Sequence, residues 1–169
     1  FALEVMPGIP GPAQEANARL AAAALRLFGV PEKALALGIA RARLVGRMQR
    51  MRRWGVELVL DGAHNPPAAA VLRRSLPRYH LVFGAFPRKD VRSVLRWLLP
   101  GAESVIFTSA GEGALDAAAF RSLLHGALYV TDPLEALMRA AARAKKRNEP
   151  VLVTGSFYLV GAVLRRLEY

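Results

Sequence analysis

Val59-Leu60-Asp61-Gly62-Ala63-His64-Asn65-Pro66-Pro67 is the stretch in which a strand and a helix meet. The apolar run from Val56 to Leu60 predicts a short buried strand. The Asn-Pro pair that follows is a start signal for a helix, which the pattern predicts from Ala68 to Leu76. A strand therefore leads into a helix through one tight turn, and this turn carries Asp61 and His64.

The start of this helix is a candidate anion site. Asn65 can accept a backbone N–H bond as the N-cap residue, and Pro66 gives up no useful donor at the first helical position. Free N–H groups and the positive end of the helix dipole favour a phosphate there. Asp61 is then a candidate acceptor for a hydroxyl group, and His64 is a candidate phosphate donor. A turn in which both side chains only satisfy local groups fits the pattern equally well.

Four more apolar runs alternate with helical patterns after this stretch. They predict strands at 79–84, 104–108, 128–131 and 151–153, and helices beginning at 91, 116, 133 and 157. Met48 to Trp54 alternates polar and apolar residues and predicts an antiparallel edge strand. The whole pattern predicts a Rossmann-like three-layer α/β domain with a mainly parallel sheet of about six strands. Four aromatic residues are predicted to lie in its core: Trp54, Phe83, Trp97 and Phe107.

Ligands of such sheets gather at the carboxyl ends of the strands, where Asp61, Lys89 and Ser156 all fall. Lys89 is a candidate anion contact, and the neighbouring Asp90 is predicted to cap the next helix. Ser156 can cap the last helix or donate to a substrate carboxylate, and the sequence leaves both roles open. Because no Gly-x-Gly-x-x-Gly opens a helix, a redox dinucleotide is not expected.

The first 45 residues have a different pattern. Phe1 to Ile9 predicts a short strand, and helices are predicted from Ala13 to Phe28 and from Pro31 to Ala40. A linker is predicted from Arg41 to Gly46. The apolar residues of the first helix fall on one face: Leu20, Ala24, Leu27 and Phe28.

Composition narrows the classes of function. The 169 residues are 53% hydrophobic, which predicts one full α/β domain plus a fragment. The absence of cysteine excludes disulfides and thiolate metal sites and fits a cytoplasmic protein. No apolar run approaches membrane-spanning length, and a first residue other than Met suggests excision from a longer chain. Of the three histidines, His80 and His125 are predicted to be structural or surface residues.

The formal net charge of +11 makes nucleic acid a partner to consider. Lysine occupies only positions 33, 89, 145 and 146, so most of the 24 basic residues are arginine. They are scattered at helical spacing, which is typical of a solvated helix surface. Aromatic residues on one exposed face would favour a noncatalytic basic nucleic-acid-binding module, but the aromatic residues above are predicted to be buried. No nucleic acid is therefore expected as a partner.

The string Leu-Asp-Gly-Ala-His-Asn-Pro at 60–66 resembles the C-terminal-domain signature of folylpolyglutamate synthases and dihydrofolate synthases, members of the Mur ligase superfamily. Two further pieces match in order: Gly-Arg-Met-Gln at 46–49 and Val-Thr-Gly-Ser-Phe-Tyr-Leu-Val-Gly at 153–161. The resemblance implies that residues 1–45 are the tail of a central ATPase domain plus a linker. Residues 46–169 are then the Mur ligase C-terminal (glutamate ligase) domain.

The resemblance implies a parent enzyme that uses ATP to add L-glutamate to folates through an acyl phosphate. The step extends tetrahydrofolate polyglutamates, makes dihydrofolate from dihydropteroate, or does both. ATP and Mg²⁺ are the implied cofactors, with the magnesium ligands mostly outside this chain and no metal ligand assigned within it. The implied protein is a cytoplasmic monomer. Because the chain lacks the family's Gly-x-x-Gly-Lys-Ser/Thr phosphate loop, it is expected to be inactive alone. Another Mur-type amide ligase remains an alternative.

By the same resemblance, Arg47 matches an arginine that reaches the ATP phosphates, a bidentate task suited to a guanidinium group. Gln14 and Asn17 match two positions of an adenine-site pattern, Gly-x-His-Gln-x-x-Asn, in which Ala13 replaces the histidine. The alternative interpretation is that the side chains of Gln14 and Asn17 simply face water on the first helical turn.

The catalytic residues implied by the resemblance are His64 and Asp61, which also belong to the ATP site. Lys89 and Ser156 are implied on the glutamate and phosphate side. Residues 109–114 are predicted to form a loop in which related synthases often carry an arginine. No arginine stands in this loop, so the function of that segment is not expected here.

Overall fold

The computed structural model describes residues 7–9 and 11–167 of the chain. The chain divides into two compact units, Phe1–Met48 and Gln49–Tyr169. The strand predicted from Phe1 to Ile9 lies mostly outside the described residues, and residues 7–9 are not part of a strand.

The first unit is a pair of helices, α1 (Pro12–Leu27) and α2 (Glu32–Arg41). Both begin and end within one residue of the predicted positions. Ala22 and Leu35 are buried between them. The predicted apolar face of α1 is not buried in this unit, since Leu20, Leu27 and Phe28 are 71%, 89% and 84% exposed.

The second unit is built on one six-stranded sheet with the strand order β1-β2-β6-β3-β4-β5. The first pair, β1 and β2, is antiparallel, and all the other pairs are parallel. This confirms the predicted mainly parallel sheet with one antiparallel edge strand. The strands are β1 (Gln49–Arg53), β2 (Val56–Leu60), β3 (Tyr79–Phe83), β4 (Ala102–Thr108), β5 (Leu128–Val130) and β6 (Val151–Thr154).

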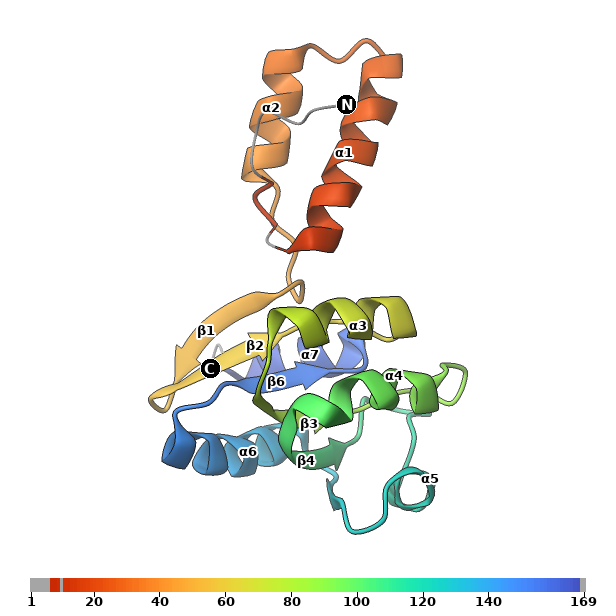
Figure 1. Ribbon diagram of the computed structural model, residues 1–169, viewed down its shortest axis with the longest axis vertical. Coiled ribbons are helices and arrows are strands. Elements are labelled where there is room, and N and C mark those ends of the chain that lie inside the picture. Colours follow the sequence, from red (N-terminus) through yellow and green to blue (C-terminus); the bar gives the residue numbers. More distant parts are fainter. Residues whose placement is uncertain (1–6, 10, 168–169) are drawn as a thin grey trace. The chain divides into compact units, whose positions relative to one another are not determined.

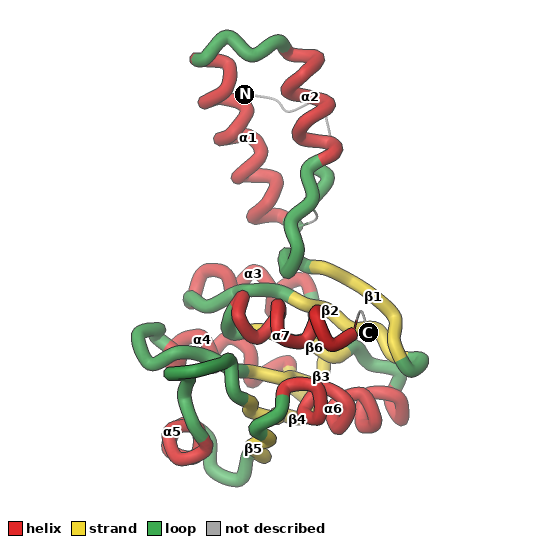
Figure 2. Tube along the Cα trace, turned by 180° about the vertical axis from the view of Figure 1, so that it is seen from behind, coloured by secondary structure: helices red, strands yellow, loops and turns green. Residues whose placement is uncertain are grey.

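Helices cover both faces of the sheet, so the three-layer prediction is confirmed. Figures 1 and 2 show α3 and α4 on one face and α6 and α7 on the other. Asn65, Asp90, Asp116 and Asp132 each cap a helix by accepting a backbone N–H bond. The helices are α3 (Pro66–Ser75), α4 (Val91–Leu98), α5 (Ala117–Leu123), α6 (Pro133–Arg147) and α7 (Phe157–Leu167), with a 3₁₀ turn, η1, at Leu99–Gly101.

Two of the four predicted core aromatics are buried and two are not. Phe83 and Phe107 are each 1% exposed and pack with Phe120 of α5. The prediction is wrong for Trp54 and Trp97, which are 45% and 49% exposed. Trp54 lies in the β1–β2 turn with a positive φ, and Trp97 lies on α4 outside the buried positions that contact the sheet.

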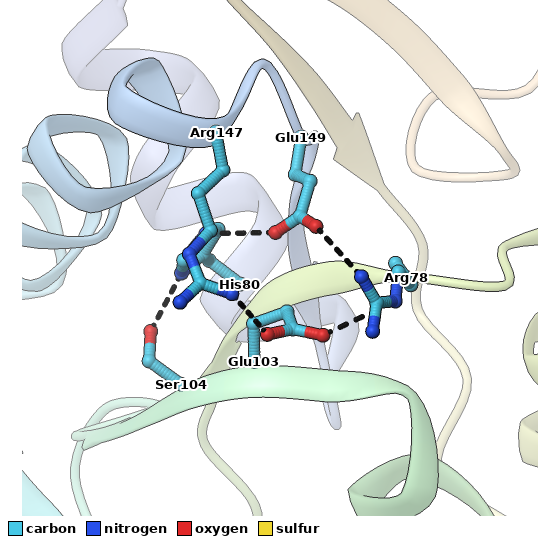
Figure 3. Close-up of polar contacts among 6 residues, drawn as sticks. All are labelled: Arg78, His80, Glu103, Ser104, Arg147 and Glu149. Carbon is cyan, nitrogen blue, oxygen red and sulfur yellow. Dashed lines mark hydrogen bonds and ion pairs between the residues drawn. The ribbon is translucent and has the colours of Figure 1, made fainter.

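A polar cluster closes the edge of the sheet at which β3, β4 and β6 begin (Figure 3). His80 is 4% exposed. Its Nδ1 lies 2.8 Å from Ser104 Oγ, and its Nε2 lies 3.3 Å from Glu149 Oε2. His80 is therefore a structural residue, as predicted, whereas His125 is exposed in the turn after α5. Ion pairs complete the cluster among Arg78, Arg147, Glu103 and Glu149.

The cluster gives the fold a pH dependence whose direction follows from His80. Burial lowers the pKa of His80, helped by Arg143 and Arg147, and outweighs the carboxylates of Glu149 and Glu103, which raise it. An unfolded histidine has a pKa of about 6.5. Because the folded-state pKa is the lower one, the stabilisation is complete above about pH 6.5 and is lost as the pH falls through the folded pKa.

We therefore expect the contribution of His80 to the free energy of unfolding to stay constant above about pH 6.5 and to fall as the pH is lowered below it. His80→Gln, which cannot titrate, should flatten this dependence, as followed by urea unfolding at each pH. His125→Gln is the matched control, because an exposed histidine should contribute no such slope. Equal slopes for His80→Gln and the parent chain would rule the explanation out.

Candidate functional site

Two turns lie side by side at the carboxyl edge of the sheet. One follows β2 and contains Asp61 to Asn65; the other follows β6 and contains Gly155 and Ser156. The strands before them are parallel neighbours, with Leu60 opposite Val153. Both turns lead directly into helices, α3 and α7. The structure thus places Asp61, with His64 three residues on, beside Ser156 at neighbouring strand ends; the strand-end argument named Asp61, Lys89 and Ser156.

Hydrogen bonds join the two turns into one unit. The Asp61 N–H donates to the Val153 carbonyl at 3.0 Å. In the other direction, the Gly155 N–H and the Thr154 hydroxyl both donate to the Ala63 carbonyl, at 3.0 and 3.3 Å. Thr154 is fully buried. A shift of either turn would therefore move the other.

Asp61 supports its own turn. Its Oδ1 accepts the Ala63 N–H at 2.8 Å, and the residue is 6% exposed. The carboxylate of Asp61 therefore satisfies a backbone group of its own turn, which is the local role that the sequence left open. It does not exclude a ligand, because a carboxylate has two oxygens and about four acceptor positions.

His64 is half-buried, and its ring is fixed by a local hydrogen bond. Nδ1 lies 2.8 Å from the Gly62 carbonyl oxygen. A carbonyl only accepts, so Nδ1 must carry the hydrogen, which leaves Nε2 as the nitrogen that can meet a ligand. To donate to a phosphate, Nε2 must also be protonated, and the ring is then an imidazolium.

The start of α3 differs from the prediction. Asn65 caps the helix, with Oδ1 accepting the Ala68 N–H at 3.0 Å. The helix already begins at Pro66, and Pro66 and Pro67 have no N–H to offer. The Ala69 N–H is taken by the Asn65 carbonyl. The prediction of free N–H donors in this first turn is therefore wrong, and an anion here would depend on side chains and the helix dipole.

Ser156 caps α7. Its Oγ accepts the Tyr158 N–H at 3.0 Å, and the residue is 5% exposed. The capping role that the sequence allowed is thus realised. Because a hydroxyl that accepts one bond can still donate another, the second role, donation to a carboxylate, stays compatible with this geometry.

Lys89 is exposed in the loop between β3 and α4. Since β3 lies on the other side of β6 from β2, this loop follows the next strand along the same edge. The adjacent Asp90 caps α4 through the Ser93 N–H. The pKa of Asp90 is held below its usual value mainly by hydrogen bonds from the Ser93 side chain and backbone.

The remaining predicted residues belong to the first unit. The Asn17 side chain donates to Gln14 Oε1 at 3.3 Å. Both residues border a mostly apolar groove between α1 and α2 of about 360 Å³, which Leu25 and Leu35 also line. Arg47 is half-buried near the end of this unit.

The sequence of the second unit matches a known family. The profile of the Mur ligase, glutamate ligase domain covers residues 46–157 of the chain, a range that includes both turns. This chain belongs to that family.

Relatives of this Mur ligase domain are synthases of folates and their polyglutamates. The chain is 35% identical over 175 residues to the dihydrofolate synthase/folylpolyglutamate synthase of Escherichia coli (strain K12), a match that covers 96% of the chain and 39% of the relative. The chain therefore spans about two fifths of that relative's length.

Solved structures resemble this Mur ligase chain closely. Folylpolyglutamate synthase of Mycobacterium tuberculosis, complexed with ADP and AMPPCP, has a TM-score of 0.85 and 25% identity, and the match covers 97% of this chain and 42% of that one. The bifunctional enzyme of Yersinia pestis, complexed with AMPPNP and Mn ion, has a TM-score of 0.83 and 27% identity, over 99% and 42% of the two chains.

Sequence reasoning missed two residues that shape the site of this Mur ligase domain. Thr154 links the two turns by a hydrogen bond, and the ring of Phe157 contacts both Gly62 and His64. Thr154 and Phe157 flank the Gly155-Ser156 pair in the sequence. What they contact follows from the pairing of β2 with β6, which the sequence does not show.

Within residues 7–9 and 11–167, no three His, Cys, Asp or Glu side chains come together as a metal site, so no step through Mg²⁺ is assigned to this chain. In the same residues no helix is long and apolar enough to cross a membrane.

Proposed function

We propose that this chain forms the C-terminal part of an ATP-dependent ligase that adds L-glutamate to folates. The observation that supports this most is the interlocked pair of turns carrying Asp61, His64 and Ser156, inside the range that matches the glutamate ligase domain. The names of the relatives support folate as the acceptor. Extension of tetrahydrofolate polyglutamates and synthesis of dihydrofolate from dihydropteroate both belong to the proposal.

The proposed reaction has two steps. A substrate carboxylate oxygen attacks the terminal phosphorus of ATP, and ADP leaves. The amine of glutamate then attacks the acyl carbon, loses a proton and displaces phosphate. The protein accelerates such chemistry mainly by positioning two bound reactants and stabilising the charge on the transferred group.

The residues of the second unit fit parts of this task. His64 donates from Nε2 to the terminal phosphate. Asp61 accepts a hydrogen bond from a nucleotide hydroxyl. Ser156 donates to the carboxylate of the incoming glutamate, and Lys89 supplies positive charge on the same edge of the sheet.

The first unit contributes the rest of the nucleotide contacts in this proposal. Arg47 contacts the ATP phosphates, and Gln14 and Asn17, on the rim of the apolar groove, contact the adenine. Residues 1–45 are assigned to the tail of an ATPase domain plus linker, and residues 46–169 to the glutamate ligase domain. We also propose that the parent enzyme uses Mg²⁺, which would neutralise charge on the phosphates. The proposed enzyme is a monomer in the cytoplasm.

The test is a chimera in which this chain replaces the matching region of the E. coli relative. We expect ATP-dependent incorporation of labelled glutamate into a folate by the chimera. The 169-residue chain alone should incorporate none, because it has no phosphate loop. A chimera that melts cooperatively and binds ATP but adds no glutamate would overturn the proposal, and so would glutamate addition by the chain alone.

Nucleic-acid binding is the second candidate, and one observation favours it. Trp97 is exposed on α4, which also carries the exposed Arg92 and Arg96. Aromatic and arginine side chains on one helix can contact bases and phosphates. Binding to oligonucleotides tighter than the non-specific range of roughly 10⁻⁴–10⁻⁶ M, with a steep salt dependence, would favour this candidate over the ligase.

A further inference from the structure

Phe157 is the first residue of α7, and its ring lies directly against Gly62 in the neighbouring turn. A Cβ atom added to Gly62 would be 2.5 Å from Cδ1 and Cε1 of this ring. Gly62 is not among the residues with a positive φ, so its backbone conformation is open to other residues. Glycine is needed at position 62 because of the aromatic ring, not because of the turn.

The same ring contacts His64. The two rings meet edge to face, with centroids 6.3 Å apart and an interplanar angle of 62°. The His64 ring is therefore fixed in two ways: Nδ1 is bound to the Gly62 carbonyl, and one side of the ring packs against Phe157. One constraint comes from Gly62 and the other from Phe157, and these two residues contact each other.

Phe157 is itself held in place by the turn that precedes it. Ser156 Oγ accepts the Tyr158 N–H, and the Ser156 carbonyl accepts the Val160 N–H at 3.2 Å. These bonds fix the first turn of α7. The next aromatic residue, Tyr158, is 73% exposed and contacts Phe86 instead of the Asp61–Asn65 turn.

We propose that Phe157 is the positioning residue for His64. Its ring holds the imidazole in the orientation in which Nδ1–H donates to Gly62, so that Nε2 is presented to the ligand. Phe157 and Gly62 act as a matched pair, since the ring occupies the space that any side chain at position 62 would need. The identity of the ligand as a phosphate rests on the proposed function; the positioning of the ring does not.

The first test reads the His64 ring directly in the 169-residue chain. Ring ¹⁵N shifts report which nitrogen of a neutral histidine carries the hydrogen, and the His64 signals can be assigned by their loss in His64→Gln. We expect mainly the Nδ1–H form in the parent chain. In Phe157→Leu, which keeps apolar bulk but loses the ring, the Nε2–H form should rise several-fold.

Two variants serve as matched controls for this measurement. Phe157→Tyr keeps the ring and should keep the Nδ1–H form, whereas a merely apolar requirement would be met by leucine as well. Tyr158→Leu removes the neighbouring aromatic ring and should leave the His64 signals unchanged. A Phe157→Leu spectrum with the parent proportion of the two forms overturns the proposal.

A double-mutant cycle tests the matched pair independently of the histidine signals. Gly62→Ala alone should lower the melting temperature and disturb His64, because the new methyl group meets the Phe157 ring. In the Phe157→Ala background the same methyl group has room, so adding Gly62→Ala should change the melting temperature much less. Additive effects of the two substitutions would contradict the pairing.

The same ring signals, measured in the ATP-binding chimera described above and in its Phe157→Leu variant, separate this inference from the proposed function. If ATP shifts the His64 signals of the parent chimera and shifts them several-fold less in Phe157→Leu, both the positioning and the nucleotide role are supported. If ATP shifts nothing but Phe157→Leu still changes the hydrogen position, the positioning stands and the nucleotide role of His64 fails. If ATP shifts the parent and Phe157→Leu equally and their hydrogen positions agree, the positioning fails alone.

Discussion

Replacement of His64 by alanine in the chimeric ligase is expected to lower kcat by roughly 30- to 1000-fold, which corresponds to about 2–4 kcal/mol of lost transition-state stabilisation. The charge on the transferred phosphoryl group changes during the reaction, and a donor on Nε2 counts most in the transition state. The melting temperature should stay close to that of the parent chimera, because His64 is half-buried and its hydrogen bond is to a carbonyl in its own turn.

The matched control for this prediction is His125→Ala. His125 is exposed in the turn after α5, so its loss should change neither kcat nor the melting temperature. Steady-state kinetics and thermal melts of both variants distinguish a chemical role from a structural one. A His64→Ala chimera with near-normal kcat and a clearly lower melting temperature would remove the histidine from the proposed chemistry.

Replacement of Gly155 by alanine is expected to destabilise the chain by about 2–6 kcal/mol. Gly155 has a φ of 105°, and a Cβ atom there would lie 2.5 Å from the Gly84 carbonyl oxygen and 2.8 Å from the Phe83 ring. The estimate combines roughly 1–3 kcal/mol for backbone strain with roughly 1–3 kcal/mol for overpacking. Urea unfolding of the 169-residue chain measures the difference.

Gly111→Ala is the control that isolates the effect of crowding. Gly111 has a φ of 122°, but an added Cβ atom would meet nothing within 4 Å. It should therefore lose only the strain contribution, about 1–3 kcal/mol. If the two alanine variants were equally stable, close packing between the β6–α7 turn and β3 would not be the reason for glycine at position 155.

Signals local to the sequence predicted most of the fold. Helix caps such as Asn65 and Asp132 are short-range hydrogen bonds, so the residues themselves mark the helix starts. Strand ends were also predicted closely, and the positive φ values of Met48 and Trp54 explain why β1 is one residue shorter at each end than expected.

What the sequence did not show depends on contacts between distant segments. Trp97 was predicted to be buried because it is aromatic, but the residues of α4 that pack on the sheet are Val91, Val94, Leu95 and Leu98, and position 97 lies outside that stripe. The missing N–H donors at the start of α3, in contrast, could have been predicted from the sequence. Pro66 and Pro67 are successive prolines, and together they remove two donors. The contact of Phe157 could not have been found in this way, because its partner Gly62 follows β2, and the sequence does not show that β2 pairs with β6.

The position of β6 has a consequence for how this domain assembles. Among residues 7–9 and 11–167 it is the last strand in sequence order, yet it lies between β2 and β3. Until residues 151–154 are in place, β2 and β3 each have an unpaired edge facing the other, and such edges are open to pairing with other chains. Residues 151–154 must therefore be synthesised before the Asp61 turn acquires the neighbour that holds it, and a ribosome-bound chain lacking β6 has no complete site to offer a ligand.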